Sequence, residues 1–480
     1  MGVVAVQKDA NAHSLAQPPQ RLARRYVSVG AGVLLMAAVG SNHAISAWNA
    51  QLRAALGYSQ AEISFVGSMA SFGAYFSVTP GAAFDAIGAH RSVLVGALLL
   101  CSVYLALAQG IVAQPALMHP LAVGVAFAVL GQASNFGVFA ALGPNEGLFG
   151  DKHRGKIMAL ELAAFSAGGA LFALLYTRYF DEDVPGYFRF MAALLLAVFL
   201  FAWLALYRET AEEREKHLLP HPTAMEEFMP PAIEYSSSSS SEDNDEHHHH
   251  VVVVQAADIT GRELLRDSRF WLLFATVFIL VGSSLFVMAN IAFIVESRRG
   301  PVAHVPAMVA LFSVGNCGGR LGGGVASDLV LARCPRVYFV SAAAVLVAAT
   351  HALFLALPPS LLAVPITLAG VADGVMFAAF PVLTRETFGA RHFGTNFGLM
   401  SVANAVGFPL FYNPLGAFVY RQAAARGSGG GGGDADKCLG DECFRPVFLL
   451  VIGLSCVALV ASLKFAARQK YAPIGRGAVV

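Results

Sequence analysis

The residues with the clearest chemical potential in this sequence are two charged side chains that stand alone in long apolar stretches. Arg320 lies in the glycine-rich run GNCGGRLGGGVASD at 315–328, and Asp373 lies in the run GVADGVMF. A charge inside hydrocarbon is costly and commonly marks the path of a substrate or ion. A guanidinium in such a place binds a carboxylate through two parallel hydrogen bonds. Arg320 is therefore predicted to bind an anionic group. The alternative is that Arg320 has a structural role, either as the partner of a helix end or with its side chain extended to the membrane interface.

Asp373 has two functional interpretations and one structural alternative. It could carry a transported proton, or it could neutralise Arg320 when the site is empty. The alternative is a structural acid capped by the backbone amide of Gly374. Asn316 stands four residues before Arg320, so it lies on the same helix face and joins the candidate site.

The other candidates for a central binding site share a polar side chain inside an apolar block: His43, Asn290 and Asn404. A histidine can titrate near neutral pH, but a hydrogen-bonded packing role is the alternative for His43. In lipid, asparagine more often joins helices than contacts a substrate. Glu161, about one turn into its block, is expected at the headgroup interface.

Membrane-spanning helices must position these residues, and the composition predicts such helices. The 480 residues are 56% hydrophobic and 13% charged, with a mean hydropathy of +0.61, whereas soluble proteins are about 25% charged. Apolar blocks of roughly 20 residues, the length of a membrane-crossing helix, recur along the chain. We predict a multi-pass integral membrane protein with two sets of six blocks: 26–49, 60–80, 91–113, 117–143, 157–178 and 187–207, then 270–296, 303–327, 337–357, 360–384, 395–419 and 446–467.

The distribution of charge predicts the topology. Lys and Arg are more frequent in the tails and the even-numbered loops than in the odd-numbered loops, which places both termini in the cytoplasm. The predicted parts are an N-terminal tail, a six-helix bundle, a disordered cytoplasmic loop, a second six-helix bundle and a C-terminal tail: 1–25, 26–207, 208–262, 263–467 and 468–480. Plasma membrane and intracellular compartments both stay open.

Two loops have distinctive compositions. The central loop contains serines at 236–241, then acidic residues, then histidines at 247–250. Such a tract is either a disordered linker or a weak metal or proton sensor. The loop before the last block contains Cys438 and Cys443, on the predicted non-cytosolic side where a disulfide persists; the alternatives are a bridge and two free thiols.

The sequence also excludes several classes of function. It contains no G-x-x-x-x-G-K-[ST] loop, so ATP is not the expected energy source. No nucleophile is paired with a base, the cysteines lack metal-site spacing, and no basic face suits nucleic acid. We therefore predict a protein that is not an enzyme and that uses no cofactor, no resident metal and no nucleic-acid partner.

Two pairs of short motifs recur in the same order along the chain. The pattern G-x-x-x-D occurs at 81–85 and again at 324–328, while FGDKHRG at 149–155 recurs as FGARHFG at 388–394. The two pairs are separated by nearly the same number of residues. This agreement predicts that the two six-helix halves arose by duplication, as in transporters with internal repeats.

The stretch GAAFDAIGAHR at 81–91 resembles the signature loop of the major facilitator superfamily, G-x-x-x-D-x-x-G-x-[RK]-[RK], with a histidine at the first basic position. The resemblance implies a gating loop in each half: Gly81, Asp85, Gly88 and Arg91, with a looser copy at Gly324 and Asp328. The aspartate of such a loop needs a cation or a helix N-terminus as its partner. The implied fold is all-α, with about twelve transmembrane helices in two pseudo-symmetric six-helix bundles and the substrate midway between them.

Within this superfamily the chain resembles the nodulin-like branch, which is related to monocarboxylate transporter-like proteins. The residues that carry this resemblance are RGKIMAL at 154–160, FWLLF at 270–274 and ETFGARHFGTN at 386–396. Monocarboxylate transporters have an acid one helical turn before the corresponding arginine, and Asn316 stands at that position here.

The predicted function is secondary transport, by alternating access, of a small organic anion such as a monocarboxylate that pairs with Arg320. A proton moved through Asp373 is an option within this function. Because Asn316 replaces the acid, the first alternative is a non-anionic solute: an amino acid, a metal chelate or a porphyrin-like compound. The second alternative is a non-transporting receptor or sensor with the same fold. The expected partners are the solute, with or without a co-transported proton, and the lipid bilayer.

Overall fold

The computed structural model describes residues 19–180, 182–208, 252–253, 258–331, 334–427, 438–469 and 471–472. In these ranges the chain is helical apart from turns and two strands of two residues each, β1 (Val252–Val253) and β2 (Tyr471–Ala472), which pair antiparallel. The tract of serines, acids and histidines at 236–250 lies outside the described residues, as does most of the predicted N-terminal tail.

The N-terminal half makes six crossings with these helices: α1 (Pro19–Val39), η1 (Gly40–Ala44), α2 (Ile45–Leu56), α3 (Gln60–Tyr75), α4 (Val78–Ala113), η2 (Pro115–Leu117), α5 (Pro120–Asn145), α6 (Asp151–Tyr179) and α7 (Val184–Ala205). The first crossing consists of α1, η1 and α2 in succession. Gly88 breaks α4 with a φ of 78°, a conformation that glycine adopts at little cost. The part of α4 before Gly88 completes the second crossing, which α3 begins, and the part after it forms the third.

The C-terminal half repeats this plan with α10 (Gly261–Arg266), α11 (Ser268–Ser297), η3 (Val302–His304), α12 (Val305–Leu329), α13 (Val337–Ala356), η4 (Pro359–Leu361), α14 (Ala363–Phe388), α15 (Phe393–Val406), η5 (Gly407–Tyr412), α16 (Asn413–Gly427), η6 (Asp441–Cys443) and α17 (Arg445–Arg468). The segment η5 is π-helical and joins α15 to α16 in one crossing. Pro409 and Pro414 lie in and beside it, and neither has a backbone N–H to continue the α-helical ladder.

The described helices form a multi-pass membrane protein. Eleven helical stretches are long and apolar enough to cross a membrane, and one of them, Glu62–Ala113, has 52 residues. A single crossing needs about 20 residues, so this stretch, broken at Gly88, supplies two crossings and the total is twelve. Large apolar side chains such as Leu98, Leu174 and Leu204 stay exposed along the helices, which suits lipid and not water. The predicted all-α membrane fold is confirmed.

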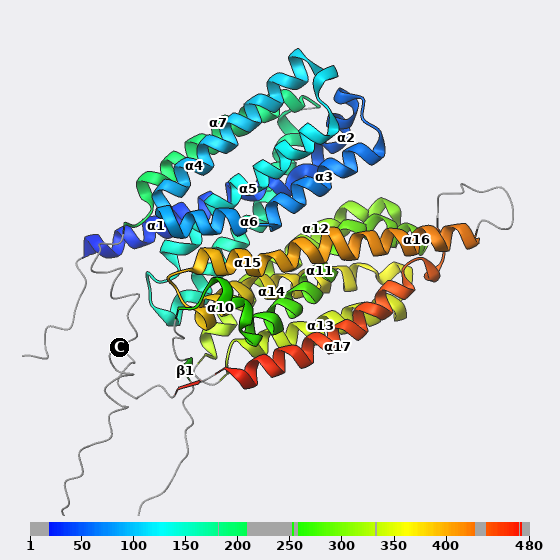
Figure 1. Cartoon of the computed structure of the whole chain (residues 1–480). Helices are drawn as coiled ribbons and strands as arrows, with labels where there is room; N and C mark the ends of the chain where they lie inside the picture. The colour runs from blue at the N-terminus through cyan, green and yellow to red at the C-terminus, as the bar shows by residue number, and fades with distance from the viewer. Residues whose placement is uncertain are drawn as a thin grey trace, which may run out of the picture.

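Figure 1 shows the two halves as separate bundles, with α1–α7 in the upper bundle and α10–α17 in the lower one. The beginning of α1 and the end of α17 lie at the same end of the molecule, which we call the terminal end. Successive crossings alternate in direction. Therefore α6, α11 and α15 also begin at the terminal end, and α5, α12 and α14 also end there. Both copies of the G-x-x-x-D motif are therefore at the terminal end.

Glycines allow the two halves to pack closely at the terminal end. Gly81 of α4 faces the backbone of Gly394 in α15, and Gly324 of α12 faces Gly155 and Ala159 of α6. A Cβ at Gly81 or Gly324 would collide with these neighbours. Small residues permit such backbone approach in membrane proteins, so the motif glycines bring each motif aspartate within reach of the opposite half.

Candidate functional site

Arg320 lies on α12 at the contact between the two halves. Its side chain is buried, with 5% of its surface exposed. Its Nε donates to Asn316 Oδ1 at 2.9 Å, and its Nη1 donates to the carbonyl of Leu162 in α6 at 3.1 Å. The guanidinium also lies 4.3 Å from the centroid of the Phe377 ring in α14. Arg320 thus joins α12 to α6 of the opposite half and packs on α14.

Asn316 connects Arg320 to Asp373. Its Nδ2 donates to Asp373 Oδ2 at 2.5 Å, while its Oδ1 accepts from Arg320 and also from Ser166 Oγ of α6 at 2.8 Å. Asp373 is 2% exposed, and its Oδ1 has no hydrogen-bond partner within the described residues. No ion pair joins Arg320 and Asp373 directly in that part of the chain, so the amide separates a buried cation from a buried acid.

Glycines place Asn316 against α14. A Cβ at Gly319 of α12 would meet the carbonyl of Val371, and one at Gly374 of α14 would meet the carbonyl of Asn316. The two backbones therefore approach more closely than larger residues would allow. The glycine-rich run around Arg320 is what lets an amide as short as that of Asn316 reach Asp373.

His43 lies beside this cluster. It is in η1, its side chain is exposed, and its ring packs edge-on against Phe165 of α6 at 5.0 Å. The charge of Arg320 acts on His43 and also on Tyr75 of α3. The ring contact places His43 against Phe165, the neighbour in sequence of Ser166, which donates to Asn316.

The two other predicted asparagines are not bonded to the cluster. Asn290 donates to the carbonyl of Phe286 in its own helix at 2.9 Å. Asn404 of α15 is buried, and its Oδ1 has no partner among the residues that the structure describes. No hydrogen bond connects either residue to Arg320 or Asp373 within those residues, so their hydrogen bonds lend no support to the predicted substrate role.

The first signature aspartate binds a helix N-terminus of the opposite half. Asp85 Oδ1 accepts from the amide of Gly394 at 2.9 Å, and its Oδ2 accepts from the amide and the Oγ1 of Thr395 at 2.7 and 2.6 Å. These groups open α15, where unpaired amides and the helix dipole favour a negative charge. Gly88 forms the break in α4, and Arg91 is exposed with no ion pair or hydrogen bond in the described ranges.

The second copy makes the equivalent contact in the opposite direction. Asp328 of α12 accepts from the amides of Gly155 and Lys156 in α6 at 3.1 and 2.8 Å, and it pairs with Arg336 at 2.5 Å. Gly155 and Gly394 are equivalent positions of the second repeated motif. The two repeated motifs therefore meet in space, each half supplying an aspartate to a helix N-terminus of the other.

A buried network of charges stands beside these contacts, and the sequence reasoning missed it. Arg385 Nε and Arg154 Nε lie 2.6 Å from the two oxygens of Glu146, Arg154 lies 3.7 Å from Glu386, and Arg336 pairs with Glu386. Burial alone would raise the pKa of Glu146, but the two guanidiniums overcome it and hold that pKa below its usual value. Glu146 and Arg385 are 239 positions apart, which is the spacing of the second repeat and the signal that could have found them.

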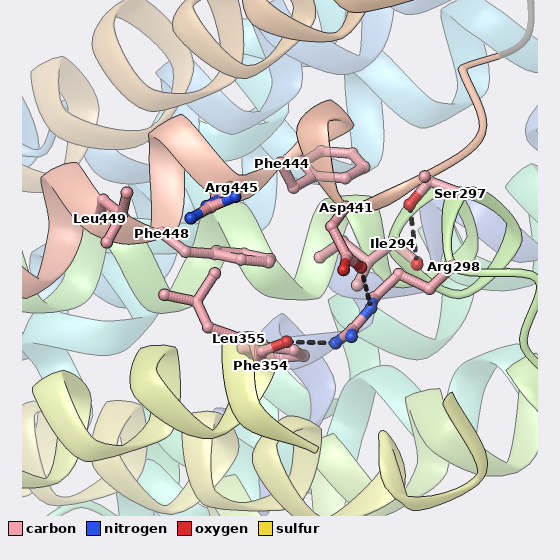
Figure 2. Close-up of a pocket in the computed structure, with 11 residues that line it drawn as sticks. Ile294, Ser297, Arg298, Phe354, Leu355, Asp441, Phe444, Arg445, Phe448 and Leu449 are labelled. Carbon is pink, nitrogen blue, oxygen red and sulfur yellow. Dashed lines mark hydrogen bonds and ion pairs between the residues drawn. The ribbon is translucent and has the colours of Figure 1, made fainter. Parts of the chain in front are cut away.

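The cavity in Figure 2 lies away from Arg320, at the end of the C-terminal half opposite the terminal end. Its volume is about 320 Å³, and phenylalanines and leucines of α13 and α17 form much of its wall. Arg298 enters it, but Asp441 at 2.9 Å and the Phe354 carbonyl already bind that guanidinium (Figure 2). The cavity is therefore not the predicted substrate site.

A disulfide closes the loop beside this cavity. Cys438 and Cys443 are bonded, so of the two alternatives left by the sequence the structure contains the bridge. Within the bridged loop, the amide of Gly440 donates to the Ser297 carbonyl of α11 at 2.7 Å. The Cys438 amide donates to Tyr420 Oη of α16 at 3.1 Å. The loop thus ties α16 and α11 to the start of α17.

Two duplicated six-helix halves, a buried arginine–amide–carboxylate cluster at their contact and reciprocal contacts at one end define a secondary transporter and not an enzyme. The chain belongs to the Major Facilitator Superfamily, whose sequence model matches residues 30–412. Members of this superfamily move small-molecule solutes. No group of three or more His, Cys, Asp or Glu side chains that could hold a metal occurs in the described ranges.

Solved structures share this fold at low sequence identity. The human organic anion transporter MFSD10 (TETRAN) has a TM-score of 0.59 and 17% identity, with 93% of this chain and 100% of that chain covered. A bacterial homologue of the iron transporter ferroportin, in an outward-facing state with soaked iron, has a TM-score of 0.61, 13% identity and coverages of 92% and 99%. A structure of the E. coli fucose:proton symporter FucP has a TM-score of 0.55, 13% identity and coverages of 92% and 98%. Among curated proteins, none matches this chain.

Proposed function

We propose that this protein transports a small organic anion, such as a monocarboxylate, and that Arg320 binds the anionic group. The observation that carries the proposal is a buried guanidinium whose protein partners are neutral: the Asn316 amide and the Leu162 carbonyl. A buried charge without an opposite charge in contact is costly. A substrate carboxylate would remove that cost through bidentate hydrogen bonds.

Asp373 supports coupling to a proton. It accepts from Asn316, the amide that also accepts from Arg320, and one of its oxygens has no partner among the described residues. In the empty transporter an ionised Asp373 balances Arg320. When an anion binds Arg320, protonation of Asp373 keeps the buried site neutral, so one proton accompanies one anion.

The proposed transport cycle is alternating access, with the terminal end facing the cytoplasm as the distribution of Lys and Arg predicts. Every hydrogen bond and ion pair found between described residues of the two halves lies at the terminal end or at the level of Arg320. In this conformation the terminal end is closed. One solved structure with a similar fold is described as an organic anion transporter. Short motifs of this chain also resemble the monocarboxylate transporter-like branch. Both similarities are consistent with an anionic substrate.

Uptake of labelled monocarboxylates into proteoliposomes across a pH gradient tests this function. Arg320→Ala should abolish uptake, and Arg320→Lys should retain only part of it because an ammonium lacks the bidentate geometry. The matched control is Arg421→Ala, since Arg421 is an exposed residue of α16. If Arg320→Ala transports the anion as the wild type does, the proposed binding role is wrong.

A zwitterionic substrate, such as an amino acid, is the second candidate. The cluster offers a cation and an acid separated by one amide, and a zwitterion could pair with both Arg320 and Asp373. A thermal-shift screen against carboxylates, amino acids and metal chelates separates the classes in the wild type. Asp373→Asn should remove amino-acid binding but leave monocarboxylate binding intact.

A further inference from the structure

Glu161 is a buried acid that the proposed transport mechanism does not use. It lies on α6 with 0% of its surface exposed, so protein encloses the side chain, in place of the expected contact with the headgroups. The structural reason is that α6 begins at Asp151, which adds more than two turns of helix before Glu161. Glu161 therefore lies inside the N-terminal half and not at its edge.

The surroundings of Glu161 are neutral. Its Oε1 accepts one hydrogen bond, from Asn145 Nδ2 of α5 at 2.6 Å, and its Oε2 has no partner in the described part of the chain. A Cβ at Gly32 of α1 would collide with the carboxyl, so α1 covers the group with backbone alone.

The hydrogen bonds around Glu161 are completed by neutral groups as well. Asn145 Nδ2 also donates to the Ser28 carbonyl at 3.2 Å, and Asn145 Oδ1 accepts from Ser28 Oγ at 2.6 Å. Ser28 Oγ in turn accepts from the amide of Tyr207 at 2.9 Å. Each donor in this series of hydrogen bonds already donates to another acceptor, so none of them donates to Glu161 Oε2.

Among the described residues, no charged side chain is bonded to Glu161. Titratable and charged groups on the elements around it that have other partners are Arg25 of α1, Glu146 after α5, Arg154 of α6, Tyr207 after α7, and Arg320 and Asp328 of α12. Arg25 donates to the Leu148 carbonyl, and the other charged members have the partners described above. Lys156 of α6 lies five residues before Glu161, and no bond joins the two in the described part of the chain. Asn145 is the sole side chain found to act on Glu161 among the described residues. An isolated ionised carboxylate in such a place is far more costly than a neutral carboxylic acid.

We propose that Glu161 is a proton-binding site, occupied and occluded in the conformation described here. The proton comes from water, gives a neutral carboxylic acid, and returns to water when the site is hydrated in another state. Glu161 precedes Leu162, whose carbonyl accepts from Arg320, so a substrate that draws Arg320 away acts on the same turn of α6. The coupling role, though not the protonation itself, rests on the proposed transport function.

Infrared spectroscopy of protein labelled with 13C-glutamate tests the protonation without any substrate. The expected result is the carbonyl band of a protonated glutamic acid at neutral pH, absent from Glu161→Gln and retained in the control Glu263→Gln. Glu263 is exposed on α10. If the wild type lacks this band, or if Glu161→Gln retains it, the proposal is wrong. Should Glu161→Gln fail to fold, the wild-type spectrum alone still tests the proposal, because the band of a protonated glutamic acid must be present.

Transport assays then test the coupling. Each proton that moves with the anion gives about tenfold accumulation per pH unit, since one pK unit is a tenfold ratio. A proton carried by Glu161 would add to the one proposed for Asp373. Glu161→Gln should lower the accumulation ratio by about tenfold at a gradient of one pH unit while equilibrium exchange of the anion continues. If Glu161→Gln accumulates the anion as the wild type does, and the wild type lacks the infrared band, the proton site at Glu161 is refuted. The proposed transport function would still stand. A wild type that moves no organic anion but shows the band would refute the proposed function alone.

Discussion

Asn316 shows how one side chain can connect two groups of opposite charge. Its amide donates to Asp373 Oδ2 and accepts from Arg320 and Ser166, so one residue bonds to all three polar neighbours, while Asp373 Oδ1 has no partner within the described residues. An aspartate at this position would pair with Arg320 directly and could not donate to Asp373 in its ionised form. An amide in place of an acid at this position thus changes the pairing of the arginine and keeps its charge available.

Asn316→Asp is expected to weaken anion binding by about tenfold or more. The new carboxylate would neutralise Arg320, and it would stand where the amide now lies 2.5 Å from Asp373 Oδ2. Two carboxylates this close do not both ionise. Isothermal titration of the purified variant with a monocarboxylate measures the change. Asn316→Ala is the control without added charge, and wild-type affinity in Asn316→Asp would contradict the bridging role.

At the residue scale the sequence predicted only part of the site. It identified Arg320, Asn316 and Asp373, because charges and amides in apolar blocks are visible as exceptions. It could not identify the Leu162 carbonyl, since every residue has one, and it placed Glu161 at the interface because the start of α6 is polar. Which backbone group meets an arginine depends on helix register and packing.

At the scale of elements, Gly324 controls how closely α12 packs on α6. Gly324→Ala is expected to disfavour the closed terminal end by about 1–3 kcal/mol, since its Cβ would collide with Ala159 and the Gly155 carbonyl. Hydrogen–deuterium exchange at the amides of Gly155 and Lys156, which Asp328 now protects, should accelerate by about 5- to 150-fold. Gly322→Ala is the matched control on the same helix, because nothing lies within 4 Å of its added Cβ. Equal exchange in the two variants would show that this contact does not hold the end closed.

The bridged loop is a second element whose loss should be measurable. Replacing Cys438 and Cys443 by serine is expected to lower the free energy of unfolding by about 2 kcal/mol, the chain-entropy value for so short a loop. The Gly440–Ser297 and Asp441–Arg298 contacts would also loosen. Thermal unfolding with and without reductant measures the effect, and Cys456→Ser, which removes a free exposed thiol, is the control. A melting temperature unaffected by either treatment would mean that the bridge does not stabilise the fold.

At the scale of the whole molecule, the repeated motifs could be recognised in the sequence. The contacts that these motifs make between the two halves could not. The equal spacing of the repeated motifs predicted two similar halves. It did not show that Asp85 and Asp328 each bind a helix of the opposite half, because a repeat describes each half separately. The Glu146–Arg385 pair was missed for the same reason, since each residue alone resembles an ordinary charge at a helix end.

The charge network makes closure of the terminal end depend on Glu146. Because Arg154 and Arg385 hold the pKa of Glu146 below its usual 4.5, its stabilising contribution is complete above that pH. The contribution is lost as the pH falls through the lowered pKa. Closure should therefore not vary with pH between about 5 and 8 on account of this group, in contrast to the proton site at Glu161.

Glu146→Gln is expected to open the terminal end at neutral pH. Removing the charge takes from Arg385 and Arg154 the carboxylate that lies 2.6 Å from each, at a cost of about 3–5 kcal/mol, although Arg154 still lies 3.7 Å from Glu386. Hydrogen–deuterium exchange at the amides of Gly155 and Gly394 should then be fast at pH 7, whereas the wild type should reach a similar rate only in acid. Glu263→Gln, on the exposed face of α10, controls for loss of a carboxylate as such. If the Gly155 and Gly394 amides exchange as slowly in Glu146→Gln as in the wild type, Glu146 does not hold the terminal end closed. Closure would then depend on the contacts of Asp85 and Asp328, which do not include Glu146.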